Sequence, residues 1–203
     1  DSQGQSIQEV FIVNRDGSGL TNISNSPEMQ ESGPAIWSPD GSRLAFFAHP
    51  SDGVWLQIVR LAGEVHSIVT GQTGGEYDGS LAWSPVDERL AFIPPSDNPN
   101  APLLLIQADG SGLKTLNSSL KGLSGVGWDA GGEWLVFAAQ DPGGLYMLHV
   151  PSSLNGNSEA LVGLTFSLPD AQPHWQPQPV PLLAAYDSSQ LNGPGDCDDI
   201  DVP

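Results

Sequence analysis

Residues 37–46 read WSPDGSRLAF, which is a tryptophan, a turn rich in Ser, Pro, Asp and Gly, and an apolar strand. The same order of features returns three times further along, as WSPVDERLAF (83–92), WDAGGEWLVF (128–137) and WQPQPVPLLA (175–184). The tryptophans that open these four segments, Trp37, Trp83, Trp128 and Trp175, are separated by 46, 45 and 47 residues. A repeat of this length is typical of a β-propeller, with one blade per unit.

Each of the first three units, which begin at residues 33, 79 and 124, continues into a second apolar half. Those halves read VWLQIVRLAGEVHSIVT (54–70), LLLIQADGSGLKTLN (103–117) and LYMLHVPSSLNGNSEALV (145–162), so each unit has room for the four strands of a blade. Gly (24) and Pro (18) make up about a fifth of the 203 residues and leave little room for helices. The sequence therefore predicts an all-β propeller with four-stranded blades of about 45 residues.

The two ends of the chain carry complementary halves of a unit. Residues 8–24 match a second half without a tryptophan segment before it, and residues 171–187 match a first half with no second half after it. Joined together, they make one blade that closes the ring and leaves no open sheet edge. We therefore predict a four-bladed propeller over residues 1–188 and an acidic tail over 189–203. Two alternatives stay open here: part of a longer propeller, and an eight-bladed dimer in which two chains pair their half-blades.

The segment WSPDGSRLAF (37–46), followed by a strand and an Asp-Gly or Ala-Gly turn, resembles the TolB-type propeller repeat, a bacterial relative of WD-repeat arrays. The resemblance covers roughly residues 9–186 and is best in the first two units. The third unit has Asp-Ala-Gly (129–131) in place of Ser-Pro-Asp, and the fourth has Gln-Pro-Gln (176–178). The resemblance implies a non-catalytic interaction scaffold in the cell envelope or outside the cell, without an active site.

The charge of the chain is strongly unbalanced. Six Lys and Arg stand against 24 Asp and Glu, a formal net charge of −18, and no Lys or Arg follows Lys121. This composition argues against binding to nucleic acids or anionic membrane surfaces, which need clustered basic residues. It favours calcium or a basic protein surface as partner, unless the charge serves only solubility. No apolar run reaches the ~20 residues of a membrane span. An acidic, Lys-poor repeat protein fits the cell exterior or cell surface, with the bacterial periplasm as the alternative.

We interpret the four repeat tryptophans as packing residues rather than a ligand-binding ring. Each holds the same place in front of an apolar strand, and large buried rings dominate core packing. Trp55 and Trp134 lie off the repeat and are candidates for a contact surface. The sequence has no Gly-x-Ser-x-Gly nucleophile motif, no His-Glu-x-x-His zinc motif and no phosphate-binding loop motif. We therefore expect that the chain is not an enzyme.

The predicted tail carries four aspartates within six residues: Asp196, Asp198, Asp199 and Asp201. They offer oxygen ligands to calcium, although the Gly at the sixth position and the closing Glu of an EF-hand loop are missing. The alternative is a solvated or partner-docking tail, since blocks of like charge are commonly interaction tails. The single cysteine, Cys197, lies among them and is a candidate for an intermolecular disulfide in an oxidising compartment.

Two functions remain after these exclusions. The first is a protein-interaction or self-assembly module, including a structural or filament subunit, because half-blades at both ends can join neighbouring chains. The second is a propeller component of a larger enzyme, such as the gate domain of a peptidase, or a small propeller hydrolase or lyase. We expect the first, with calcium as the one candidate cofactor.

Overall fold

The computed structural model describes residues 9–24, 30–49, 53–61, 65–69, 79–117, 119–151 and 160–164. Every regular element assigned in these ranges is a β-strand, as the composition predicts. The predicted C-terminal half-blade (171–187) and acidic tail (189–203) lie outside the described residues. With them lie Trp175, Cys197 and the four tail aspartates.

The strands form antiparallel sheets that follow the repeat. A two-stranded sheet contains β1 (Phe11–Ile12) and β2 (Thr21–Asn22). The next sheet, called blade 1, contains β3 (Gln30–Trp37), β4 (Arg43–His49), β5 (Trp55–Arg60) and β6 (Val65–Val69). Blade 2 contains β7 (Ser80–Trp83), β8 (Arg89–Ile93), β9 (Leu103–Gln107) and β10 (Lys114–Asn117). Blade 3 contains β11 (Ser124–Trp128), β12 (Trp134–Gln140), β13 (Gly143–His149) and β14 (Leu161–Gly163).

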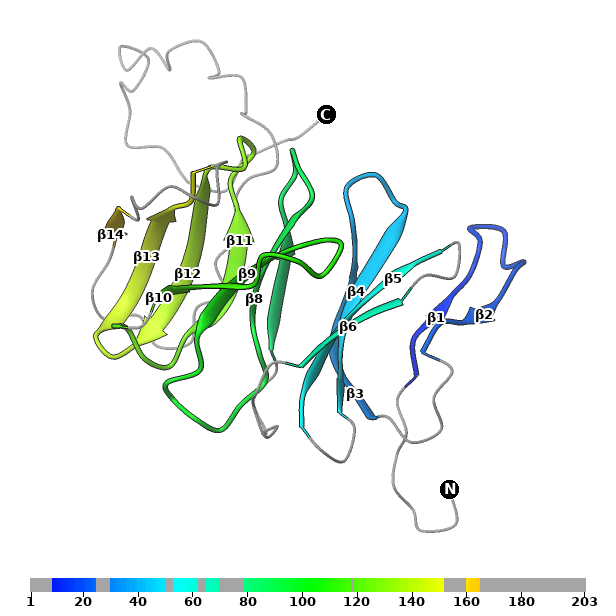
Figure 1. The fold of residues 1–203 in the computed structure, drawn as a ribbon, viewed down its shortest axis with the longest axis horizontal. Coiled ribbons are helices and arrows are strands. Elements are labelled where there is room, and N and C mark those ends of the chain that lie inside the picture. The colour runs from blue at the N-terminus through cyan, green and yellow to red at the C-terminus, as the bar shows by residue number, and fades with distance from the viewer. Residues whose placement is uncertain are drawn as a thin grey trace, which may run out of the picture.

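Within each blade the strands lie side by side in the order of the sequence. The first strand of blade 2, β7, contacts β3 of blade 1 and β11 of blade 3. The three blades therefore stand next to one another, joined mainly along their first strands, and the β1–β2 pair lies beyond blade 1 (Figure 1). This is the arrangement of neighbouring propeller blades.

The three blades also share one register. The repeat tryptophan at the end of the first strand lies opposite the leucine that follows the turn, in the pairs Trp37 with Leu44, Trp83 with Leu90 and Trp128 with Leu135. A shift of one residue would move every apolar side chain to the other face of the sheet. The repeated motif therefore sets the register of each blade at the same point.

In blades 1 and 3, an aspartate holds the turn between these strands. In blade 1, Asp40 accepts hydrogen bonds from the Ser38 hydroxyl at 2.6 Å and from the Ser42 backbone at 3.0 Å and hydroxyl at 2.6 Å. In blade 3, Asp129 takes the position that Ser38 holds in blade 1. Its carboxylate accepts hydrogen bonds from the backbone N–H groups of Glu133 and Trp134, each at 2.8 Å. The different turn sequence of the third unit thus gives an equivalent turn.

The core lies between the blades. Between blades 1 and 2, the buried side chains include Phe47, Leu56 and Ile58 on one side and Phe92 and Ile106 on the other. A second cluster between blades 2 and 3 includes Leu105, Leu135, Phe137, Tyr146 and Leu148. Because both faces of the middle strands are covered, β8 and β9 are almost continuously buried, with no polar alternation.

The N-terminal half-blade covers the other face of blade 1. Val10, Ile12 and Ile23 from the β1–β2 region pack against the cluster that contains Leu44 and Phe46. The segment predicted from residues 8–24 therefore lies where a blade preceding blade 1 would lie.

Candidate functional site

The repeat tryptophans join each blade to the one before it. The indole Nε1–H of Trp83 donates to the backbone carbonyl of Ile36 at 3.3 Å, and that of Trp128 donates to the carbonyl of Ala82 at 3.0 Å. Ile36 and Ala82 are the residues that directly precede the tryptophan of the preceding blade. The same hydrogen bond is therefore made at both junctions between described blades.

Trp37 holds the equivalent position in blade 1 but is 47% exposed, whereas Trp83 and Trp128 are 8% and 7% exposed. The equivalent carbonyl acceptor for Trp37 would belong to the first strand of a preceding blade, and the described residues before blade 1 contain no such tryptophan strand. The exposed indole marks the side of blade 1 where the first strand of a further blade would pack.

Blade 2 inserts a buried arginine into blade 3. Arg89, which opens the apolar strand β8, is 2% exposed. Its Nη2 donates to the carbonyl of Gly132 at 2.6 Å, and its Nη1 donates to the carbonyl of Pro151 at 3.1 Å. The guanidinium carbon lies 4.9 Å from the centre of the Trp128 ring, within the range of a cation–π contact. The guanidinium thus fills the junction between blades 2 and 3.

Close packing at that junction depends on a glycine. A Cβ atom on Gly132 would lie 2.3 Å from Cγ2 of Val86 in blade 2, and the φ angle of Gly132 is +66°. Both facts favour glycine here, because a side chain would clash and the left-handed backbone is costly for other residues. Blades 2 and 3 can therefore approach closely at this point.

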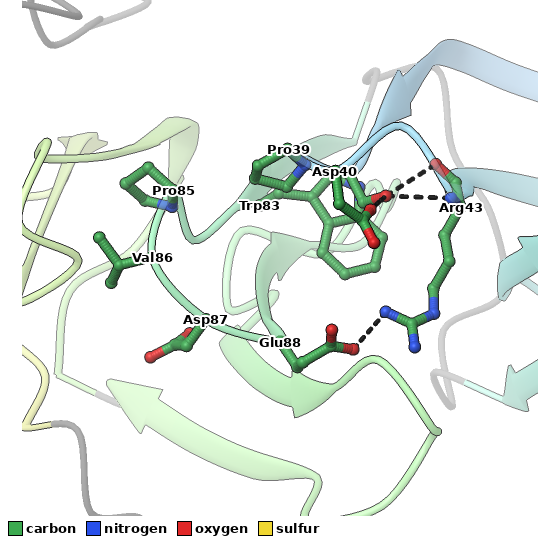
Figure 2. A pocket seen from close by; sticks show the side chains of 9 residues that line it. Pro39, Asp40, Arg43, Trp83, Pro85, Val86, Asp87 and Glu88 are labelled. Atoms are coloured by element: carbon green, nitrogen blue, oxygen red, sulfur yellow. Dashed lines mark hydrogen bonds and ion pairs between the residues drawn. The ribbon is translucent and has the colours of Figure 1, made fainter.

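A pocket of about 190 Å³ lies at the corresponding place between blades 1 and 2. Counting from the repeat tryptophans, Asp87 corresponds to Gly132 and Asp40 corresponds to Val86. The pocket is lined by residues of both turns: Ser38, Pro39, Asp40, Arg43, Trp83, Pro85, Val86, Asp87 and Glu88. In the view of Figure 2, Asp40 overlaps the Trp83 indole and Glu88 lies below it. Two carboxylates, Asp40 and Asp87, thus stand where the next junction has a valine and a glycine.

Arg43 corresponds to Arg89 in the repeat but has a different partner. Its Nη1 is paired with the Glu88 carboxylate of blade 2 (Figure 2). The Arg43 side chain is 14% exposed and that of Glu88 is 58% exposed, so the pair lies at the rim rather than in the core. The pocket consequently keeps an open interior beside the Trp83 ring.

Two carboxylates of the pocket, those of Asp40 and Asp87, are held in the charged form. Hydrogen bonds from Ser38 and then Ser42 hold the pKa of Asp40 well below its usual range. Burial acts to raise the pKa of Asp87, but hydrogen bonds from Arg89 and Ser84 and the charge of Arg89 outweigh it and lower the pKa. The pocket therefore presents negative charge at neutral pH.

The off-repeat tryptophans, Trp55 and Trp134, are both half-buried. The ring of Trp134 lies 4.9 Å from that of His149, and the buried Nε1 of Trp55 finds no acceptor among the described residues. In the part of the chain that the structure describes, no group of three or more His, Cys, Asp or Glu side chains is arranged to hold a metal ion.

The described ranges also contain no helix of the length and apolar character that a membrane span requires.

Sequence reasoning did not single out Arg43, Arg89, Asp87 or Glu88. One signal was present: the chain has only six Lys and Arg, and two of them, Arg43 and Arg89, occupy the same position of the first two units. Their different roles depend on the residues of the following blade, which the motif alone does not pair with them.

The comparisons with known proteins support the fold. The sequence matches no protein-family model, and it has no significant match among curated proteins.

Solved structures do match. TolB from Acinetobacter baumannii superposes with a TM-score of 0.56 and 15% identity over 78% of this chain and 37% of the TolB chain. A protein assigned as TolB from Agrobacterium tumefaciens superposes with a TM-score of 0.56 and 14% sequence identity. The match covers 80% of this chain and 57% of the Agrobacterium chain. A chain of the nidogen–laminin complex superposes with a TM-score of 0.52 and 11% sequence identity. The match covers 75% of this chain and 56% of the matched chain.

These identities are low, and the chain spans between 37% and 57% of the length of the matched chains. The likeness therefore concerns the fold, and it agrees with the repeat, the four-stranded sheets and their register. The chain has the all-β fold of TolB-like β-propellers.

Proposed function

We propose that this chain is a non-catalytic β-propeller module that binds other proteins. The observation that carries the proposal is the pocket between the first two blades. It combines the Trp83 ring, two prolines and a valine with charged groups at its rim, and the blade 1 turn that borders it is fixed by its own hydrogen bonds. A pocket with an aromatic floor and several charged groups suits a side chain of a protein partner.

Two further observations support this function. The matched nidogen–laminin structure is a complex of two proteins, so a chain with a similar fold belongs to a protein–protein complex there. The net charge of −18 disfavours nucleic acids and leaves basic protein surfaces as suitable partners. We also propose that the protein acts outside the cytoplasm, at the cell surface or in the periplasm, in keeping with its acidic composition.

A peptide-display selection on the purified chain tests protein binding. Selected peptides are measured against two variants, Pro39→Trp and Ala130→Trp. Pro39 lines the pocket, and Ala130 occupies the equivalent turn position of blade 3; both are exposed. We expect peptides that bind the wild type and Ala130→Trp equally and lose at least tenfold in affinity to Pro39→Trp. Failure to select any peptide, or binding that ignores Pro39→Trp, would contradict the proposal.

Self-assembly is a second candidate, and the exposure of Trp37 favours it specifically. A first strand with its own tryptophan segment fits that side of blade 1, and residues 171–187 carry such a segment. If a neighbouring copy supplies it, chains join head to tail into rings or filaments. Light scattering decides: particles much heavier than one 21.3 kDa chain that dissociate in Trp37→Glu support assembly. A single-chain mass contradicts it and favours closure of the ring within one chain.

Calcium binding by Asp196, Asp198, Asp199 and Asp201 and an intermolecular disulfide through Cys197 stay proposals of the same kind. The light-scattering measurement is repeated with calcium or a chelator, and with or without reductant. A mass that depends on calcium supports the first proposal, and one that falls with reductant supports the second. A mass that is independent of both assigns the tail no part in assembly.

A further inference from the structure

The two junctions between described blades place the same residue type differently. Arg43 and Arg89 both stand six residues after a repeat tryptophan, at the start of an apolar strand. Arg89 lies inside its junction, whereas Arg43 is paired with Glu88 at the rim. The position of Arg89 shows which chemical group can be buried inside a junction of this kind.

At the second junction the accepted group is a guanidinium. Arg89 lies over the Trp128 ring, and its Nε donates to a carboxylate oxygen of Asp87 at 2.8 Å while Nη2 donates to a backbone carbonyl at 2.6 Å. An aromatic face, a carboxylate and carbonyl oxygens together satisfy the charge and the planar donors of arginine. The side chain is held there although it is almost fully buried.

At the first junction the same kinds of group surround an open space. The floor is Trp83, the counterpart of Trp128, and the carboxylates of Asp40, Asp87 and Glu88 line the walls with Arg43 as the one basic lining residue. A volume of about 190 Å³ is far more than the ~15 Å³ that a single water molecule needs. The space is therefore large enough for the end of a long side chain.

Asp40 has capacity for a further donor. A carboxylate has about four acceptor positions, and the bonds from Ser38 and Ser42 account for three of them. Its low pKa keeps it charged at neutral pH. A cation that enters the pocket thus meets a fixed, ionised oxygen beside an aromatic ring.

We propose that the pocket between blades 1 and 2 is a subsite for an arginine side chain of a protein partner. The incoming guanidinium lies against the Trp83 indole and donates to Asp40 and to Glu88, as Arg89 lies against Trp128 and donates to Asp87 within the chain. Arginine is favoured over lysine because its planar fork both stacks on a ring and donates to two acceptors. The net charge of −18 adds a long-range attraction for a basic partner.

This inference rests on the proposed protein-binding function and names the chemistry of its ligand. The probe is Nα-acetyl-arginine amide, titrated into the isotope-labelled full chain while the indole N–H signal of Trp83 is followed by NMR. The neutral isostere Nα-acetyl-citrulline amide and the lysine analogue are titrated in parallel. We expect a saturable shift with the arginine probe and roughly fivefold weaker binding of citrulline, because the loss of charge removes the cation–π and ionic contacts.

Variants locate the site. Asp40→Asn and Glu88→Gln should each weaken arginine binding roughly threefold or more by removing one charged acceptor. Asp16→Asn is the matched control, since Asp16 holds an Asp-Gly-Ser turn of the same kind by bonds to Ser18 but lies in the N-terminal half-blade. It should leave the affinity unchanged.

The outcomes separate this inference from the proposed function. No saturable shift of Trp83, or equal binding of arginine and citrulline, overturns the arginine subsite. If displayed peptides still bind in a manner sensitive to Pro39→Trp, the protein-binding function stands without it. Arginine-probe binding with no selectable peptide would keep the subsite and overturn the broader function.

Discussion

The two blade junctions are built from the same motif and differ in how they are filled. Between blades 2 and 3, Val86 meets Gly132 closely and the Arg89 guanidinium is buried over Trp128. Between blades 1 and 2, the corresponding positions are Asp40 and Asp87, and a pocket replaces the close contact. Two carboxylates repel each other and occupy more space than a valine against a glycine. The second junction is therefore filled by its own side chains, whereas the first contains an open pocket.

The largest expected difference comes from two glycines, Gly41 and Gly132, that hold the same position of equivalent turns, four residues after the repeat tryptophan. Gly132→Ala should lower the free energy of unfolding by about 3 kcal/mol, since it adds a clash with Val86 to the strain of a left-handed backbone. Gly41 has nearly the same φ, +68°, but a Cβ atom added there would have no other atom within 4 Å. Gly41→Ala should therefore cost only the strain, about 1 kcal/mol. Urea denaturation measures both, and equal losses would mean that the close approach contributes nothing.

The two arginines give the next largest difference. Arg89→Met removes the guanidinium bonds to the half-buried Asp87 carboxylate and to the backbone carbonyls of Gly132 and Pro151, and we expect a loss of about 3 kcal/mol. Arg43→Met removes an ion pair at the rim and should cost less than ~1 kcal/mol. Thermal and urea unfolding of both variants check this. Similar losses would show that Arg43 also stabilises its junction.

The repeat tryptophans Trp128 and Trp37 differ in burial, so equivalent substitutions should have different costs. Trp128→Phe removes the hydrogen bond to Ala82 and part of a buried ring, for an expected loss of about 1.5 kcal/mol. Trp37→Phe changes a ring that is 47% exposed and should cost less than ~0.5 kcal/mol. Urea midpoints provide the measurement. A large loss in Trp37→Phe would indicate that its indole makes a contact equivalent to that of Trp128.

The smallest effect concerns acid stability. Bonds from Ser38 and Ser42 lower the pKa of Asp40 from its ordinary 3.8, so they stabilise the folded chain above that pH. This contribution is lost as the pH falls below 3.8 toward the lower native pKa, and Asp40→Asn lacks it throughout. The melting temperature of Asp40→Asn should therefore fall less than that of the wild type between about pH 5 and pH 2. A parallel fall in both proteins would contradict this account.

Much of the fold could be predicted from the sequence because the repeat carries its own local chemistry. The tryptophan spacing, the apolar strand seven residues later and the Asp-Gly turn indicate blades, and the structure has four-stranded sheets in which Trp83 lies opposite Leu90. The altered turn at Asp129 also folds equivalently, because one carboxylate there accepts the backbone donors that a serine and an aspartate hold elsewhere.

The candidate site could not be predicted in the same way. In the sequence, Asp40 is a turn residue and Glu88 an ordinary surface charge, and they become neighbours only when two consecutive blades pack together. An alignment of the repeats matches Asp40 with its counterpart in blade 2, Val86. It does not show that Asp40 lines a pocket together with Asp87 and Glu88 of the neighbouring turn.

The sequence by itself determined the all-β class, the four-stranded unit and the register, because these follow from hydrogen bonding and apolar periodicity within a few dozen residues. Only the tertiary structure decided which arginine is buried, which tryptophan stays exposed and where the pocket opens. Those outcomes depend on the volume and charge of side chains that meet across a junction. At the second junction Val86 lies close against Gly132, whereas at the first the corresponding positions hold two carboxylates, Asp40 and Asp87, which line the pocket beside Trp83.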